Sequence, residues 1–477
     1  MNDSKPVVRY QQTMLFIGVA LLFLGIGRMF SLVMHEPVLG YANNYDMIRL
    51  QACHQIWPAD AAVNIRTGTP QAPLRRYTLD KRVDTPCHPS AELLFTSTAI
   101  ALATWKNYFT GETLISIKSI GMVKAVCLAI TAVLVSFYFY RRALYSALLI
   151  NGLIMLAVLS DPGVTLYMNT FYTEFSAIYF VYLALAGAAI VVIEQWRPIG
   201  AMPLLVGLLG IGFSMPQHLP LTLGIGLSVA AYAIAQRQWQ IAPIIAVFLA
   251  MPLLLQTSAT FTPRSEAMTQ TSRINLLGSL LEHSDHPDQL LAHLTLPKSC
   301  QSLRGKNGYD PNAAVVSTCP ELQQLNTTTI LLALLRQPAL FFNVVKQALL
   351  EQKNWVFDLY GQVENGKTES ASHYQRTLNN LIRPLPDVAL LWIVAFSIAA
   401  PLLLLTAGKI RTGKIHALYL YLGLLLFMQW IVLVSAITGN GLVGIGKNIH
   451  LYTPLLLAEI AILPIAFSVW RKTGDHS

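Results

Sequence analysis

The feature that most constrains this chain is a series of apolar runs, each long enough to cross a lipid bilayer. About twenty apolar residues in a helix span a hydrocarbon core of roughly 30 Å. Only 12% of the 477 residues are charged, and the mean hydropathy is +0.50, whereas soluble domains carry about a quarter charged residues. The sequence predicts an all-α polytopic membrane protein with ten spans, at 14–34, 118–139, 144–160, 171–193, 199–214, 219–236, 240–257, 386–408, 415–437 and 451–470.

The basic residues of the short connections predict the orientation of these spans. Cytoplasmic connections carry an excess of Lys and Arg. One set of connections holds Lys5, Arg9, Arg141, Arg142, Arg197, Arg237, Lys409, Arg411, Lys414, Arg471 and Lys472, whereas the opposite set holds only Lys447. We therefore expect both termini to be cytoplasmic, and two long segments, 35–117 and 258–385, to lie on the outer face.

The same pattern divides the chain into three predicted parts. Residues 1–257 form a membrane module of seven spans that includes the outer loop 35–117. Residues 258–385 form a large outer loop domain, and residues 386–477 form a C-terminal module of three spans. The helical pattern of 91–109 predicts an amphipathic helix at the membrane interface, and Pro338 interrupts a second apolar helix at 329–360.

The cysteines agree with an oxidising outer compartment. Cys53 and Cys87 fall in the first outer loop, Cys300 and Cys319 fall in the second, and Cys127 lies within a span. Two cysteines in each outer loop suit two disulfides. Neither pair has the spacing of a metal site, so we expect pairing within each loop.

Three carboxylates close to the outer ends of spans are the candidate catalytic residues. Charges near hydrocarbon are costly and often functional. Asp46 follows the first span, and Asp161 and Glu174 flank the turn before the fourth span. Each has a structural alternative, because Asp46 suits the cap of a loop helix and Asp161, which precedes Pro162, suits an ordinary turn.

Basic residues near the same face are the candidate substrate-binding residues. Lys447 precedes the last span, Lys118 and Lys124 lie in the outer half of the second span, and Arg49 follows Asp46 by three positions. A lysine in such a place binds a phosphate at the membrane surface, or extends to lipid headgroups.

The histidines lack the spacing of a metal site. His218 is retained as a substrate-binding candidate, although His54, His88 and His218 also suit solvated or capping positions. The glycines of GNGLVG at 439–444 lack the βαβ context of a dinucleotide site. The net charge of +9 follows from the membrane orientation, so no nucleic-acid partner is expected.

These motifs resemble those of the GT-C glycosyltransferases, which are polytopic enzymes that use polyprenyl-phosphate-linked sugars. The stretch NNYDMIRL resembles their first-loop Asp motif, and NTFYTEFSAIYF resembles their second acidic position, here Glu174. A closer resemblance, carried by NTFYTEF and by the segment 274–310, is to the membrane hexose transferases of bacterial surface-glycan assembly, the WsfD-like group. The sequence departs from the family pattern where Met47 follows Asp46 and where Lys447 replaces a frequent Arg.

The resemblance implies a mechanism and a place for it. A polyprenyl-phosphate sugar would present its headgroup on the outer face of the bacterial cytoplasmic membrane. Asp46 would accept the proton of a glycan or protein acceptor, for example a pilin. Lys447, with Lys118 or Arg49, would bind the phosphate, and Glu174 would orient sugar hydroxyls. No cofactor is assigned with certainty, and a divalent cation is left open.

Two other classes fit part of the pattern. A surface-polysaccharide polymerase or ligase also has a long outer loop, and it depends on arginines for which Arg264, Arg273 and Arg304 are candidates. A secondary transporter would place charges in mid-membrane and show repeated halves. The sequence shows no internal repeat, and its acids gather at one face.

Overall fold

The computed structural model describes most of the chain. Described are residues 4–472 without 43–44, 60–71, 80–85, 195–197, 258–265, 310–318, 358–360, 365, 367–370, 373–374 and 413–416. Among the basic residues named above, Arg197, Arg264 and Lys414 lie outside the described residues.

Six of the described helices are long and apolar enough to cross a membrane, so this is a multi-pass membrane protein. They are α1 (Ser4–Val33), α4 (Ile117–Arg141), α7 (Glu174–Glu194), α9 (Leu219–Ala235, with the turn η2, Pro216–His218, before it), α16 (Asp387–Thr412) and α17 (Ala417–Asn440). Each coincides with a predicted span.

The other four predicted spans are also apolar helices, but their apolar stretches are shorter, at 17 residues or fewer. They are α5 (Tyr145–Ile154) continued by η1 (Met155–Leu159), α8 (Pro198–Ser214), α10 (Ile241–Thr257) and α19 (Tyr452–Lys472), whose apolar stretch covers Tyr452–Ser468. A helix rises 1.5 Å per residue, so seventeen residues reach only about 25 Å. Length and composition therefore support six spans, and the prediction of ten is not confirmed.

One further pair of helices would raise the number of spans to seven. Helix α13 (Thr327–Arg336) and helix α14 (Pro338–Leu350), continued by η6 (Glu351–Asn354), meet at an angle of 109°. The bend falls at Pro338, which lacks the N–H that a continuous helix needs. The predicted interruption at this proline is confirmed.

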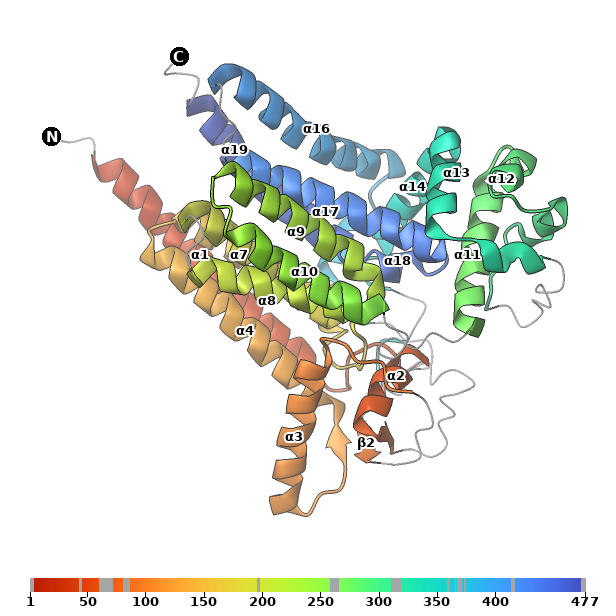
Figure 1. Cartoon of the computed structure of the whole chain (residues 1–477). Coiled ribbons are helices and arrows are strands. Elements are labelled where there is room, and N and C mark those ends of the chain that lie inside the picture. Colours follow the sequence, from red (N-terminus) through yellow and green to blue (C-terminus); the bar gives the residue numbers. More distant parts are fainter. Residues whose placement is uncertain are drawn as a thin grey trace.

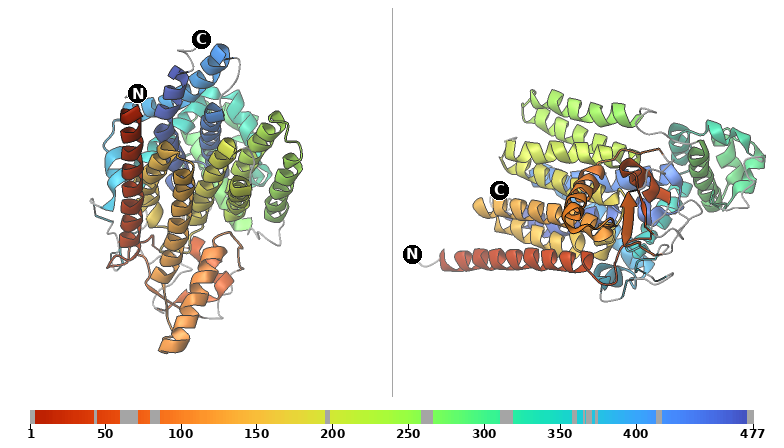
Figure 2. Two further views of the ribbon diagram at one scale, coloured as in Figure 1. Left: turned by 90° about the vertical axis from the view of Figure 1, so that its left-hand side faces the viewer. Right: turned by 90° about the horizontal axis from the view of Figure 1, so that it is seen from below.

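The apolar helices lie side by side in one bundle (Figure 1). The start of α1 and the end of α19 lie at one end of the bundle, and α11 (Glu266–His283) and α12 (Pro287–His293) lie at the opposite end (Figure 2). Small residues allow close approach within the bundle. A Cβ on Gly187 of α7 would come within 2.4 Å of the backbone of Leu204 in α8, as in other membrane helix pairs.

In its described residues, the first loop region (35–117) combines two helices with a small sheet. Helix α2 (Tyr45–His54) leads into β1 (Ile56–Pro58), which pairs antiparallel with β2 (Arg76–Leu79), and β2 pairs with β3 (Ile115–Ser116). Helix α3 (Leu93–Thr110) projects from the bundle (Figure 1). Its exposed large apolar side chains are typical of a helix in a membrane interface, and they are Leu94, Leu102, Trp105, Tyr108 and Phe109.

The second loop region, residues 258–385, is mainly helical. Besides α11 to α14 it contains η3 (Lys298–Leu303), η5 (Pro320–Gln324) and α15 (Thr377–Ile382). It meets the first loop region through a bridge between Leu39 and Val363. Nearby, Arg75 donates to Glu364 at 2.7 Å. The two loop regions are therefore joined.

Both predicted disulfides are confirmed. Cys53 pairs with Cys87, with Cα atoms 4.5 Å apart, and Cys300 pairs with Cys319, with Cα atoms 5.0 Å apart. Each pair lies within one loop region, and Cys127 is free. The first disulfide ties the end of α2 to a segment 34 residues later, so it restrains the helix that carries Asp46.

Replacement of either disulfide by two serines is expected to lower the melting temperature of the purified protein in detergent. Closing a loop of this length stabilises a folded state by about 2–5 kcal/mol. Cys127→Ala is the matched control and is expected to change the melting temperature little, because this thiol has no disulfide partner. Equal melting temperatures for the disulfide variants and wild type would contradict the pairing.

Candidate functional site

The first residue of the candidate site along the chain is Asp46, near the start of helix α2. It lies in the first turn of α2, where the helix dipole favours a negative charge. Arg49, three residues later, places a guanidinium nitrogen 3.6 Å from the Asp46 carboxylate. The side chain of Asp46 is 43% exposed, so solvent or a substrate reaches it directly.

Lys447 connects Asp46 to Glu174. It lies in the single turn α18 (Ile445–Asn448), which follows Gly444 in the left-handed region at φ 64°. Its ammonium is 2.7 Å from Asp46 Oδ2 and 3.3 Å from Glu174 Oε1, and it lies 4.4 Å from the centre of the Tyr172 ring. We call Asp46, Arg49, Glu174 and Lys447 the central cluster.

The central cluster is asymmetric in its burial. Glu174, the first residue of α7, is 2% exposed, whereas Asp46 is partly open. The Lys447 ammonium, with Arg49 beside it, holds the pKa of Asp46 below its ordinary value. Asp46 is therefore a carboxylate at neutral pH. Within the cluster, the Lys447 ammonium contacts both this partly exposed acid and the buried acid Glu174.

Tyr309 lies at the exposed side of the central cluster. Its phenol is within electrostatic range of Asp46, Arg49 and Lys447, while 68% of the residue is exposed. It belongs to the second loop region, within the segment 274–310 that carries the family resemblance. The structure therefore brings both loop regions to one place.

Two histidines lie beside the buried part of the cluster. His218, in η2, is buried and its Nδ1 lies 2.9 Å from Ser214 Oγ. The ring of His218 is 5.5 Å from the ring of His450, which in turn lies 6.0 Å from the Tyr167 ring. Sequence reasoning missed His450, although its place three residues after Lys447 was a usable signal.

Lys118 lies outside the central cluster. Its ammonium is 2.5 Å from Glu36 Oε1 and donates to the Met34 carbonyl oxygen at 3.1 Å. Arg75 also pairs with Glu36, so Lys118 helps to hold the first loop region against the end of α1. The structure therefore pairs Lys118 with Glu36 and does not bring it together with the other predicted substrate-binding residues.

Lys124 has a buried partner that the sequence did not indicate. Its ammonium is 2.5 Å from Glu92 Oε1 and donates to the carbonyl oxygens of Tyr167 and Thr170 at 3.1 and 2.8 Å. The other oxygen of Glu92 accepts the Ser176 backbone N–H at 3.0 Å. This buried pair therefore fixes the turn before α7 and the first turn of α7, which carries Glu174.

Asp161 is fully engaged by structural contacts. It caps α6 (Pro162–Thr165) by accepting the Gly163 N–H, and it accepts the indole N–H of Trp355 at 2.9 Å. It also accepts the Leu378 N–H at 3.1 Å and pairs with Arg28 at 3.2 Å. These contacts match the alternative in which Asp161 is a turn residue, and within the described residues none of them reaches the central cluster.

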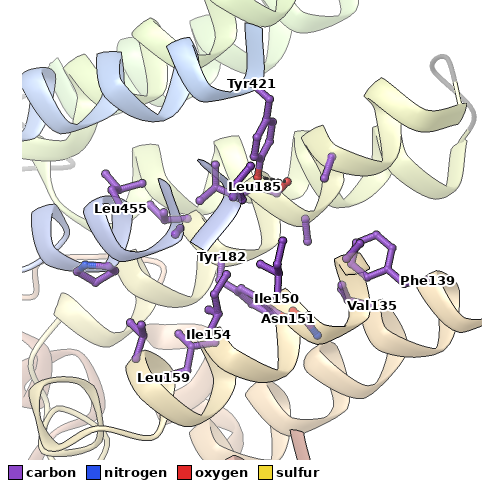
Figure 3. Close-up of a pocket in the computed structure, with 18 of the residues that line it drawn as sticks. Val135, Phe139, Ile150, Asn151, Ile154, Leu159, Tyr182, Leu185, Tyr421 and Leu455 are labelled. Carbon is purple, nitrogen blue, oxygen red and sulfur yellow. Dashed lines mark hydrogen bonds between the residues drawn. The ribbon is translucent and has the colours of Figure 1, made fainter. Parts of the chain in front are cut away.

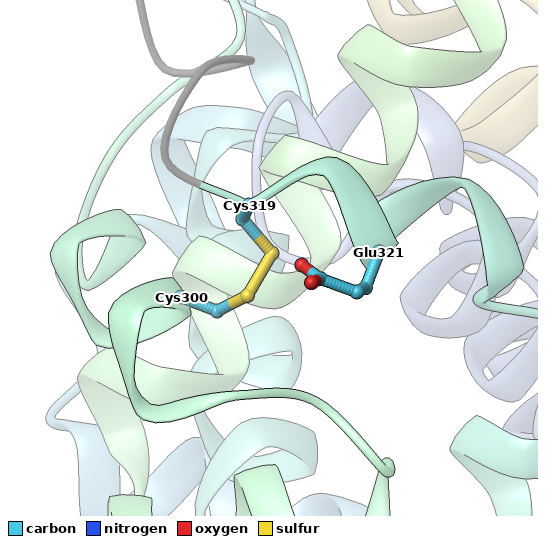
Figure 4. Close-up of side chains that lie close together, drawn as sticks. All are labelled: Cys300, Cys319 and Glu321. Carbon is cyan, nitrogen blue, oxygen red and sulfur yellow. A yellow bond between two sulfur atoms is a disulfide. The ribbon is translucent and has the colours of Figure 1, made fainter.

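In the part of the chain that the structure describes, two groups of acidic or sulfur side chains that could be considered for a metal ion already have other partners. Ligand atoms of Cys300, Cys319 and Glu321 lie within 4.8 Å of one another, but the two sulfurs are bonded to each other (Figure 4). In the central cluster the Lys447 ammonium occupies the space between the carboxylates of Asp46 and Glu174.

An apolar cavity of about 520 Å³ lies within the bundle (Figure 3). Its walls come from α4, α5, η1, α7, α17 and α19. Polar side chains at its wall have partners, because Tyr182 donates to Asn151 at 2.8 Å and Asn151 donates to Ser136 behind the wall at 2.7 Å. Tyr421 likewise donates to the Leu185 carbonyl oxygen at 3.1 Å. The cavity therefore presents mostly hydrocarbon, which suits an apolar chain.

Lys124→Met is expected to destabilise the protein strongly, because it leaves the Glu92 carboxylate buried without its partner. Breaking a buried ion pair costs about 3–5 kcal/mol. The double variant Glu92→Gln with Lys124→Met is expected to recover part of that loss in thermal unfolding in detergent. Lys298→Met, which removes an exposed pair with Asp288, is the control. A large loss in the control with none in Lys124→Met would contradict this role.

The comparison with known proteins places the chain in a family. The model of the YfdI N-terminal transmembrane domain matches residues 9–473. No curated protein and no solved structure gives a significant match. The match covers the bundle, both loop regions and every residue of the central cluster. The chain therefore belongs to the YfdI N-terminal transmembrane domain family.

Proposed function

We propose that this protein is a membrane glycosyltransferase of the GT-C class. It transfers a sugar from a polyprenyl-phosphate-linked donor to a glycan or protein acceptor. The observation that carries the proposal is the Lys447 ammonium held between Asp46 and Glu174, close to an apolar cavity in the same bundle. The similarity to surface-glycan hexose transferases supports a hexose as the donor sugar.

The cavity supports a donor with a long apolar tail. Two of its lining residues adjoin the site, because Ile178 lies one helical turn after Glu174 and Leu451 follows His450. A phosphate bound by Lys447 and Arg49 would therefore have hydrocarbon walls within reach of its lipid. Lysine binds a phosphate as a point charge, and arginine adds directional donors.

Asp46 is the proposed general base. The acceptor hydroxyl oxygen forms a bond to the anomeric carbon while the bond from that carbon to the phosphate oxygen breaks. The electron pair leaves with the polyprenyl phosphate, and the hydroxyl proton passes to Asp46. When the donor phosphate shares the Lys447 ammonium, Asp46 loses part of its charge partner. Its basicity then rises at the moment when it is needed.

The proposed location is the outer face of the cytoplasmic membrane. Two features support it, namely the basic residues of the short connections and the two disulfides. In this orientation both termini are cytoplasmic, and the acceptor approaches the exposed side of Asp46 from outside.

Asp46→Asn is expected to lower turnover by about 10²–10⁴-fold, because it removes the proton acceptor. The measurement is sugar transfer by the purified protein in detergent from synthetic polyprenyl-phosphate sugars, with a panel of glycan and peptide acceptors. Asp285→Asn, a change at an exposed acid of the second loop region, is the matched control and should retain wild-type turnover.

The outcomes of this comparison separate the parts of the proposal. Equal turnover by wild type and Asp46→Asn would remove Asp46 as the base. A wild type that transfers no sugar from any donor would overturn the proposed function. A melting temperature close to that of wild type would show that Asp46→Asn is folded.

Ala189→Phe is expected to raise the KM for long-tailed donors, because Ala189 lines the apolar cavity and a phenyl ring would fill part of it. The KM for a donor with a tail of two isoprene units should change much less. Ala246→Phe, at an exposed position of α10, is the control. Equal effects on long and short tails would place the tail elsewhere.

A further inference from the structure

His450 presents a buried nitrogen with no partner. Its Nδ1 lies 2.9 Å from the Lys447 carbonyl oxygen. A carbonyl oxygen only accepts, so Nδ1 carries the hydrogen, and burial lowers the pKa of the ring, which is therefore neutral. Nε2 is consequently an acceptor, and it is buried without a hydrogen-bond partner among the described residues.

Glu174 presents a second acceptor of the same kind. Its Oε1 pairs with the Lys447 ammonium, and its Oε2 is buried without a hydrogen-bond partner among the residues that the structure describes. Both acceptors belong to side chains that contact Lys447. The negative charge of Glu174 also acts on the His450 ring, so the two groups are close.

Two buried acceptor atoms that lie close together without hydrogen-bond partners require an explanation. Buried polar groups in folded proteins nearly always have partners, and an unpaired one costs free energy. The neighbouring His218 differs, because its two ring nitrogens lie near Ser214 Oγ and Gln217 Nε2. Of the two histidines beside the central cluster, His450 therefore has a ring nitrogen that is open to an outside donor, and it lies close to the open oxygen of Glu174.

We propose that His450 Nε2 and Glu174 Oε2 accept hydrogen bonds from hydroxyl groups of the donor sugar. The pair then sets which sugar the protein accepts, while Lys447 binds the phosphate of the same donor. A sugar ring supplies the required chemistry, because it carries hydroxyl donors on adjacent carbons a few ångströms from its phosphate. This inference rests on the proposed function and adds His450 as a specificity-determining residue.

The test compares His450→Phe with wild type on the polyprenyl-phosphate hexose that wild type uses best among glucose, galactose and mannose. A set of donors that each lack one hydroxyl is then assayed with both proteins. We expect wild type to lose about 10- to 100-fold in kcat/KM when the recognised hydroxyl is absent. His450→Phe should lose a similar factor on the full sugar and be insensitive to that same hydroxyl.

Two variants complete the comparison. His450→Gln keeps an acceptor on a side chain of similar reach, so it should restore part of the discrimination. His286→Phe, at an exposed position of the second loop region, should leave discrimination unchanged. Melting temperatures in detergent establish that each variant is folded.

Each outcome decides one question. Equal losses of His450→Phe on every donor, or no loss at all, would overturn the recognition role, as would a buried water that satisfies His450 in a donor complex. A wild type inactive on all donors would overturn the proposed function and this inference with it. Activity without discrimination would overturn the inference alone.

Discussion

The contact of the Lys447 ammonium with two carboxylates is the interaction on which this site depends. It joins residues about 400 positions apart in the chain, because Asp46 follows the first span, Glu174 begins α7 and Lys447 precedes the last span. The Lys447 ammonium and the Arg49 guanidinium together balance the charges of the two acids. Without the ammonium, the buried Glu174 would lose its charged partner, and an unpartnered buried charge is strongly destabilising.

The fold was largely predictable, because the membrane imposes a strong and simple pattern. Each predicted apolar run is helical, and Pro338 breaks a helix as expected. The number of spans was not predictable, since hydropathy does not tell a short span from a buried helix. Helix α8, with closely packed glycines and an internal proline, shows the difficulty.

The central cluster was predicted in part. Asp46, Glu174, Lys447 and Arg49 were each chosen because a charge near hydrocarbon needs a reason, and they meet in the structure. The same rule also selected Asp161, Lys118 and Lys124, whose charges are balanced by Arg28, Glu36 and Glu92. Sequence alone did not separate the two groups, because partners far along the chain decide whether a charge is structural. His450 was missed because this rule selects charged residues, and its position three residues after Lys447 was not used as a signal.

The buried pair of Lys124 and Glu92 also bears on how the chain enters the membrane. A lysine within a span is costly to insert, and Lys124 lies within α4, which is made before the Tyr167–Thr170 turn. During synthesis Glu92 is the earlier partner, and the two carbonyl contacts form only after the next two helices have emerged. The contacts that hold Lys124 in α4 are thus completed by a later part of the chain. The formation of these contacts also positions Glu174 at the start of α7.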